Sequence, residues 1–373
     1  MRRGVLGCAA AAVAVLLAGC AGAGTGARAG HDWSRRGPYP VGVTTLDLGS
    51  AGSLGERLAT VFYPAGATGF TAHPAFRYRI ADPLPAALLT FVPARYDSTV
   101  TVDARVDPRP SSHGPFPVVL FSHGFGASRL YYSELLSGIA SWGFVVTSAD
   151  YLERGILAEA TQAKVTDTPA VDLTTMLSSL DAIERASADP ASPLFGAADP
   201  HRVAAVGHSS GGETAFDALA DPRVRTAVGW APEGPSGRPS DKPVAIIGAL
   251  GDIGLTPAAL GGEYEAFPGP AAFVEISGEG HNTYTDVCPS IRGGGGGLVG
   301  YAISLHLVSG ELAKLAVNGC TKRDAPPSSF WPVVQAYTVA SLRYGLGIDG
   351  VPPSSAVDAG SFPGFTVTVR HHG

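Results

Sequence analysis

Short, wholly apolar runs alternate with longer stretches of helical periodicity from Phe116 onward. Apolar runs of this kind are typical of parallel strands that are buried on both faces of a sheet. The strands predicted in this way are residues 117–122, 144–148, 202–207, 224–229, 243–249 and 272–276. The helical stretches between them are residues 131–141, 171–186 and 213–220. Strands and helices that alternate in this order predict a mostly parallel, doubly wound α/β sheet with flanking helices.

The residues before this alternation follow a different pattern. Residues 41–48 and 57–63 alternate apolar and polar positions, which predicts two half-exposed antiparallel strands at a sheet edge. Residues 65–114 then form a long insertion that is rich in proline and aromatic residues. Such an insertion either forms a lid, with Phe91 and Tyr96 along the substrate path, or adds surface packing. The pattern leaves both interpretations open.

Two further helices are predicted after the last buried strand, over residues 298–317 and 331–344. The five glycines at 293–297 predict a flexible connector, since no phosphate-binding motif surrounds them. Residues 351–373 give little structural signal, and we interpret them as a C-terminal tail. The catalytic domain is therefore expected to span residues 38–350.

The N-terminus has the features of an export signal. Two arginines precede an apolar run over residues 5–17, which is too short to span a bilayer. The next residues, Leu17-Ala18-Gly19-Cys20, resemble the lipobox of bacterial lipoproteins, whose signal peptide is cut before a lipidated cysteine. We therefore expect a signal peptide over residues 1–19, a lipid on Cys20 and a flexible tether over residues 20–37. Cleavage at a nearby small-residue site, followed by secretion, is the alternative.

Composition and charge narrow the function classes. Of the 373 residues, 45% are hydrophobic and 16% are charged, which is enough apolar material for a large core. Without the signal peptide, 24 basic residues stand against 32 acidic ones, so the mature chain carries a net charge of −8. No nucleic-acid partner is expected, because phosphate binding requires a basic surface. We expect a monomer.

The cysteines agree with export. Cys8 leaves with the signal peptide and Cys20 is expected to carry lipid, so Cys288 and Cys320 remain as a pair. In an oxidising compartment this pair is expected to form a disulfide. Closing a loop of this length would stabilise the fold by about 3–4 kcal/mol in the chain-entropy model.

One motif carries candidate chemistry. Gly207-His208-Ser209-Ser210-Gly211 matches the pattern G-x-S-x-G, and it follows a predicted buried strand and precedes a predicted helix. In this context the pattern forms a nucleophile elbow, a sharp turn that exposes the serine hydroxyl. The glycines are required because a Cβ would clash with the strained backbone. Ser209 is therefore the predicted nucleophile.

A serine hydroxyl needs a base to take its proton, and this base is a histidine. His281 lies in a loop just beyond the last core strand, between Gly280 and Asn282. His306 also lies downstream, but within a predicted helix, where a packed or surface histidine is the common case. We therefore predict His281 as the base.

The histidine needs an acid that holds its tautomer and stabilises the imidazolium. Asp252 directly follows the strand at 243–249, in a turn that can aim its carboxylate at an imidazole. An Asx turn or a helix cap is the alternative role for this residue. Glu233 and Asp286 are the reserve candidates for the acid.

An oxyanion hole requires two backbone donors. The N–H of Ser210 is one candidate, because this residue starts the helix after the elbow. The second donor is expected from the loop after the first buried strand, where we nominate Phe125. His123 in the same loop is expected to bond the loop backbone rather than to take part in catalysis.

These residues carry a family resemblance. The segment Phe121-Ser122-His123-Gly124-Phe125-Gly126-Ala127-Ser128-Arg129, followed by Tyr132-Ser133 and Ser141-Trp142-Gly143-Phe144-Val145-Val146, resembles the plasma-type platelet-activating-factor acetylhydrolases. It is also similar to the bacterial polyester hydrolases related to cutinases. Both are α/β-hydrolases, and the resemblance covers about residues 116–281.

The resemblance implies a Ser-Asp-His triad, an oxyanion hole from Phe125 and Ser210, ester substrates, and no metal or cofactor. Trp230, in Gly229-Trp230-Ala231-Pro232, resembles the aromatic residue that some polyester hydrolases place at the acyl subsite. Core packing explains this tryptophan equally well. The insertion at 65–114 and the cysteine pair depart from the cutinase-like pattern, and they argue against a polymer substrate because a lid would narrow the cleft.

We therefore expect an extracytoplasmic, membrane-anchored serine hydrolase that cleaves small-molecule or lipid esters through an acyl-enzyme. A serine peptidase of the same fold is one alternative, although the propeller or cap domain of such peptidases is missing. A non-catalytic cell-surface binding protein on a hydrolase scaffold is the other. It is disfavoured because every predicted triad member is present.

Overall fold

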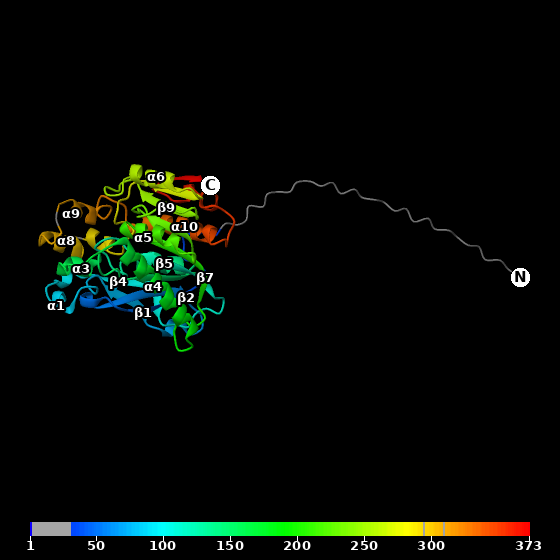
Figure 1. Cartoon of the computed structure of the whole chain (residues 1–373), viewed down its shortest axis with the longest axis horizontal. Helices are drawn as coiled ribbons and strands as arrows, with labels where there is room; N and C mark the ends of the chain where they lie inside the picture. Colours follow the sequence, from blue (N-terminus) through cyan, green and yellow to red (C-terminus); the bar gives the residue numbers. More distant parts are fainter. Residues whose placement is uncertain (2–30, 294, 309) are drawn as a thin grey trace. The chain divides into compact units, whose positions relative to one another are not determined.

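The computed structural model describes Met1 and residues 31–293, 295–308 and 310–373. The predicted signal peptide beyond Met1, the lipidation site Cys20 and most of the predicted tether lie outside these residues. The described residues form one 11-stranded sheet with the strand order β11-β10-β9-β8-β7-β5-β6-β2-β1-β4-β3. In Figure 1 the blue strands β1 and β2 lie toward one end of the sheet, and the yellow-green β9 and the red C-terminal strand lie toward the other.

Six neighbouring strands form the parallel centre of the sheet. They are β5 (Phe116–Ser122), β6 (Val145–Ala149), β7 (Ala198–His208), β8 (Val224–Trp230), β9 (Val244–Ala249) and β10 (Ala271–Ile276). Each is parallel to its neighbours among the six. Every residue of β5, β6 and β9 is buried, as is typical of parallel strands covered on both faces. The predicted mostly parallel α/β fold is confirmed, and each of the six strands lies where the apolar runs predicted it.

The edge beyond β6 is mixed. β1 (Val41–Ser50) and β2 (Glu56–Pro64) pair antiparallel, and β2 pairs antiparallel with β6. The insertion contributes β3 (Ala75–Arg79) and β4 (Thr99–Val106), and β4 runs parallel to β1. The insertion is thus in part an extension of the sheet. The short elements α1 (Ala86–Leu89) and η3 (Ala94–Tyr96) lie between these two strands.

Helices cover both faces of the sheet (Figure 1). One face carries α2 (Ser133–Ala140) and α10 (Pro327–Gly345), which share a core with Val119 and Phe121 of β5. The other carries α4 (Pro169–Ala188), α5 (Ser210–Asp217) and α6 (Pro257–Ala266), which share a second core with Val118 and Leu120. Successive β5 side chains enter opposite cores because strand side chains alternate between faces.

Shorter helices follow β6 and β10. They are α3 (Ile156–Thr161), α7 (Cys288–Arg292), α8 (Gly297–Ser304) and α9 (Gly310–Val317), and Figure 1 shows α3, α8 and α9 on the same side of the fold as α1. The single helix predicted over residues 298–317 is therefore two helices. The break contains His306, whose φ of 60° is incompatible with a continuing right-handed helix. Among the described residues, none of the helices combines the length and the hydropathy needed to cross a membrane.

The structure corrects the C-terminal boundary of the domain. Residues 351–373 do not form a tail, because β11 (Val367–His372) pairs antiparallel with β10 along its whole length. Val367 and Val369 pack against one of the two cores. The helical turns α11 (Pro353–Ala356) and η5 (Ala359–Ser361) lead into this strand. The domain thus extends to the end of the chain, and β11 closes one edge of the sheet.

The N-terminal boundary also shifts. Trp33 is 8% exposed, and the side-chain amide of Gln335 in α10 donates hydrogen bonds to the carbonyls of Trp33 and Arg35. The N–H of Gly37 donates to the hydroxyl of Ser141, 2.7 Å away. The prediction of a flexible tether over residues 20–37 is therefore wrong for residues 33–37, which pack against the domain.

Candidate active site

A strained turn connects β7 to α5 at Ser209. Its φ of 57° and ψ of −125° lie outside the regions that residues other than glycine usually adopt. The turn is closely packed, since a Cβ at Gly207 would lie 1.9 Å from the carbonyl oxygen of Gly211. A Cβ at Gly211 would lie 2.1 Å from the carbonyl oxygen of Ser122. The glycines of the motif therefore allow the backbone to form a nucleophile elbow.

The structure brings Ser209, His281 and Asp252 together. The hydroxyl of Ser209 lies 3.0 Å from Nε2 of His281, and Nδ1 of His281 lies 2.7 Å from Oδ2 of Asp252. The side chains of His281 and Asp252 are 5% and 0% exposed. Because a carboxylate can only accept, Nδ1 of His281 carries the proton and Nε2 is left to accept from the serine hydroxyl. This is the arrangement in which a histidine can activate a serine.

Asp252 serves two purposes with its two oxygens. Oδ2 accepts from His281, while Oδ1 accepts from the N–H groups of Gly254 and Leu255, at 2.8 and 2.9 Å. The Asx-type turn that the sequence offered as an alternative is therefore present as well, and it orients the carboxylate toward the imidazole. The reserve acids lie elsewhere: Glu233 is exposed, and Asp286 accepts from Tyr78.

Sequence reasoning missed Asn318, which connects the Asp252 loop to the His281 loop. Its Oδ1 accepts from the N–H groups of His281, at 2.7 Å, and Ile253, at 3.2 Å. Its Nδ2 donates to the carbonyl of Gly251, 3.1 Å away. No motif marks this residue, but its place two residues before Cys320 was a usable signal, because the disulfide expected there would bring it back to the loop after His281.

The predicted disulfide is present. Cys288 and Cys320 are bonded, and both are fully buried. The bond connects the start of α7 with the loop after α9, close to Asn318. It therefore fixes the segment that holds the histidine loop.

The predicted oxyanion donors lie on the two segments that meet at Ser209. Ser210 begins α5, so its N–H is one of the donors that a helix leaves free at its N-terminus. Phe125 lies in the loop after β5, and within the described residues its N–H donates no hydrogen bond. A Cβ at Gly124 would lie 3.3 Å from the Cβ of Ser209, which places this loop directly against the elbow. His123 donates from Nδ1 to the carbonyl of Gly124, in agreement with the structural role expected for it.

A second buried histidine connects all three loops of the site. Nε2 of His208 donates to the carbonyl of His281 at 2.9 Å, so Nδ1 accepts from the hydroxyl of Tyr132 at 2.8 Å. The same hydroxyl accepts from the N–H of Gly124. Burial, together with the nearby imidazole of His281, holds the pKa of His208 well below its ordinary value. His208 therefore stays neutral and holds the three loops in fixed positions.

Trp230 does not have the role that the resemblance suggested. Its side chain is fully buried, Nε1 donates to the hydroxyl of Thr338 in α10, and its ring packs against Phe121 and Tyr284. A tryptophan enclosed in this way has no surface for an acyl group. Core packing, the alternative considered above, is what the structure shows.

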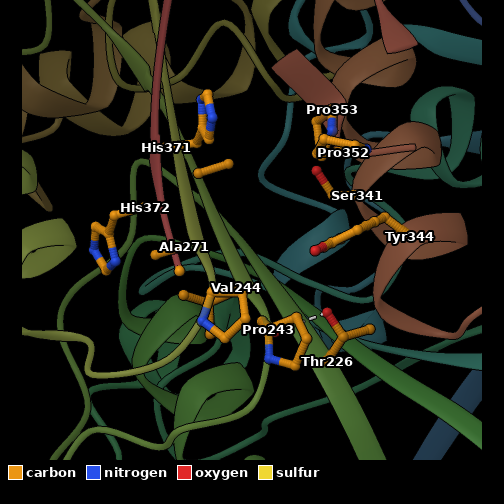
Figure 2. A pocket seen from close by; sticks show the side chains of 13 residues that line it. Thr226, Pro243, Val244, Ala271, Ser341, Tyr344, Pro352, Pro353, His371 and His372 are labelled. Carbon is orange, nitrogen blue, oxygen red and sulfur yellow. Dashed lines mark hydrogen bonds between the residues drawn. The ribbon is translucent and has the colours of Figure 1, made fainter. Parts of the chain in front are cut away.

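Figure 2 shows the surroundings of a small cavity beside β11. It is lined at the amino ends of three parallel strands by Thr226, Val244 and Ala271, and by His371 and His372 of β11. Ser209, in contrast, follows the carboxyl end of β7. In a parallel sheet all amino ends lie at one edge and all carboxyl ends at the other, so the cavity and Ser209 lie at opposite edges. The cavity measures about 30 Å³, which is the space of one water molecule and too little for an ester.

Comparisons with known proteins match parts of this chain and its fold. A family model described as Chlorophyllase matches residues 106–229, which include the loop after β5 and the elbow. A solved structure of a ferulic acid esterase from Streptomyces cinnamoneus covers 89% of this chain and 96% of its own, with a TM-score of 0.62 and 23% identity. The chain has an α/β-hydrolase fold. Within this chain, 135 residues are 31% identical to Chlorophyllase-1 of Arabidopsis thaliana. That match spans 36% of this chain and 38% of the plant protein.

Proposed function

We propose that this protein is a serine hydrolase of carboxylic esters. The observation that carries the proposal is the continuous hydrogen-bonded line from Ser209 through His281 to Asp252 on an α/β-hydrolase elbow. Relatives named as a chlorophyllase and a ferulic acid esterase support an ester as the substrate.

The geometry supports a two-step reaction. Oγ of Ser209 attacks the ester carbonyl carbon while its proton passes to Nε2 of His281. Asp252 stabilises the resulting imidazolium, and the N–H groups of Phe125 and Ser210 bind the oxyanion of the tetrahedral intermediate. The intermediate expels the alcohol, which takes the proton from His281. A water molecule, deprotonated by the same imidazole, then attacks the acyl carbon, releasing the acid and restoring Ser209.

The role of Ser209 can be tested with p-nitrophenyl esters. Ser209→Ala should lower kcat by roughly 10⁴–10⁶-fold, because the nucleophile of a triad is lost. The same variant should no longer react with a fluorophosphonate probe. Ser236→Ala is the matched control, since this serine is exposed and its hydroxyl bonds only Asp217. Undiminished turnover or labelling in Ser209→Ala would contradict the proposal, and cleavage of peptide anilides rather than esters would favour a peptidase.

The subtype stays a prediction. Acetylhydrolase-like and polyester-hydrolase-like substrates differ in acyl length, so a series of esters from acetate to decanoate separates them. We further propose that the domain is exported and held at a membrane by a lipid on Cys20, and the buried disulfide is compatible with an oxidising compartment. Metabolic labelling with a fatty acid analogue, compared between wild type and Cys20→Ala, tests this anchor.

A further inference from the structure

Arg154 is a buried cation that the reaction described above does not use. It lies in the loop after β6, and its side chain is 1% exposed. An arginine is almost never this deeply buried unless other groups satisfy its donors. The hydrogen-bond partners of Arg154 therefore indicate its role in the site.

The guanidinium contacts both segments that supply the proposed oxyanion donors. It donates to the hydroxyl of Ser122 at the end of β5, 2.7 Å away, and to the carbonyl of His123 in the loop that follows. On α5 it donates to the hydroxyl of Ser210, 3.2 Å away. The carbonyl of Arg154 accepts from the N–H of Gly126 at 2.8 Å. Phe125 thus lies between His123 and Gly126, and Arg154 hydrogen-bonds to both.

The remaining contacts fix the guanidinium itself. Nε donates to Oδ2 of Asp172 in α4, 2.5 Å away, and the group lies 4.6 Å from the ring centroid of Tyr151. Burial raises the pKa of Asp172, although the charge of Arg154 opposes this change. A buried ion pair is weak evidence for stability, because desolvation offsets the attraction. Stability alone therefore explains this arginine poorly.

We propose that Arg154 is a positioning residue of the oxyanion hole. It sets the distance between the N–H groups of Phe125 and Ser210. It also places a positive charge behind these two donors, and this charge stabilises the negative charge that the oxyanion in front of them develops in the transition state. The inference rests on the proposed ester hydrolysis.

The test compares Arg154→Met with Arg57→Met. Arg57 approaches the same loop, bonding the carbonyl of Asp150 and the carboxylate of Glu153, but among the described residues its guanidinium donates to neither oxyanion segment. Arg154→Met should lower kcat for p-nitrophenyl butyrate by about 10–100-fold, somewhat less than the loss of a direct donor, with KM changed less than about 3-fold. Arg57→Met should change both constants less than about 3-fold.

A transition-state analogue separates this role from a merely structural one. A trifluoromethyl ketone forms a tetrahedral adduct with the serine, so its oxyanion occupies the hole, whereas the corresponding trifluoromethyl carbinol is neutral and forms no adduct. In Arg154→Met the affinity for the ketone should fall in parallel with kcat/KM, and the affinity for the neutral carbinol should stay nearly constant. A folded variant that keeps its kcat and its affinity for the ketone overturns the proposal, and so does an equal loss of affinity for both inhibitors.

Two milder variants keep the test decisive if Arg154→Met does not fold. Arg154→Lys retains the charge but loses the forked donors, and Ser122→Ala removes one acceptor. Each should lower kcat and affinity for the ketone together, by about 3–10-fold. Unchanged values in both variants would overturn the proposal. Failure of wild-type protein to hydrolyse any ester through Ser209 would instead contradict the proposed function.

Discussion

At the scale of single residues, the site depends on positions where no side chain fits. Gly207 and Gly211 allow the strained backbone of Ser209 to lie against the loop after β5, because a Cβ at either glycine would meet a backbone carbonyl. Backbone atoms cannot move aside as the end of a flexible side chain can. The strain at Ser209 is therefore maintained by close packing around it.

Gly211→Ala tests this packing. Its Cβ would lie 2.1 Å from the carbonyl oxygen of Ser122, so the variant should lose about 1–3 kcal/mol of unfolding free energy and at least about 10-fold in kcat/KM. Gly262→Ala in α6 is the control, since no atom lies within 4 Å of its added Cβ. That helical change should stabilise the protein by about 0.5–1 kcal/mol with unchanged kinetics. Urea unfolding and p-nitrophenyl ester kinetics measure both, and equal behaviour of the two variants would contradict the packing argument.

The candidate triad was predictable from sequence, whereas the residues that support it were not. Ser209 has a motif, and His281 and Asp252 each follow a core strand in the expected chain order. Arg154 and Asn318 carry no motif, and their partners lie more than 30 residues away along the chain in most cases. The indole of Trp230 could not be placed, because a tryptophan after a core strand fits either a pocket wall or the core.

At the scale of elements, the segment after His281 is held by a buried carboxyl group. Oδ2 of Asp286 accepts from the hydroxyl of Tyr78 in β3, at 2.8 Å, and from the N–H of Glu134 at the start of α2, at 3.2 Å. The N–H of Asp286 donates to the carbonyl of Tyr131. This aspartate therefore connects the histidine segment with the insertion and with the segment that follows the loop after β5.

This carboxyl group predicts a pH dependence of stability. Burial raises the pKa of Asp286 from 3.8 to about 7, so the folded state favours the neutral acid. Its contribution to stability is complete below pH 3.8 and is lost as the pH rises through about 7. Asp286→Asn removes this titration, so its unfolding free energy relative to wild type should rise by about 3 kcal/mol between pH 5 and pH 8.

Urea unfolding at four pH values measures this difference. Asp47→Asn is a suitable control because Asp47 is exposed, and its difference from wild type should stay constant across the range. Parallel curves for Asp286→Asn and wild type would show that the carboxyl group does not titrate between pH 5 and pH 8.

At the scale of the whole molecule, the last strand of the chain protects a sheet edge. β11 covers the backbone of β10, which would otherwise expose unpaired N–H and carbonyl groups beside a buried core. The sequence predicted the central strands because each contains a short, mainly apolar run. It did not predict β3, β4 or β11, because short alternating segments at a sheet edge resemble loops until their partner strand is known.

Deleting residues 366–373 should therefore destabilise the protein. The loss of packing by Val367 and Val369 should cost roughly 2–4 kcal/mol, and the exposed edge of β10 should promote aggregation. Thermal unfolding with light scattering measures both effects. Removal of Gly373 alone is the control, since β11 stays intact. If the truncated protein were as stable and as soluble as the control, pairing with β11 would not be needed to stabilise β10 or to prevent aggregation.

The packing of Trp33 against α10 limits how far a lipidated enzyme could act from its membrane. Twelve peptide units separate the proposed anchor, Cys20, from Asp32, and when fully extended they span at most about 40 Å. The catalytic domain would then work within a shallow layer above the bilayer. Its substrates would be esters that reside in the envelope or diffuse into this layer, and dilution of the cells would not separate the enzyme from them.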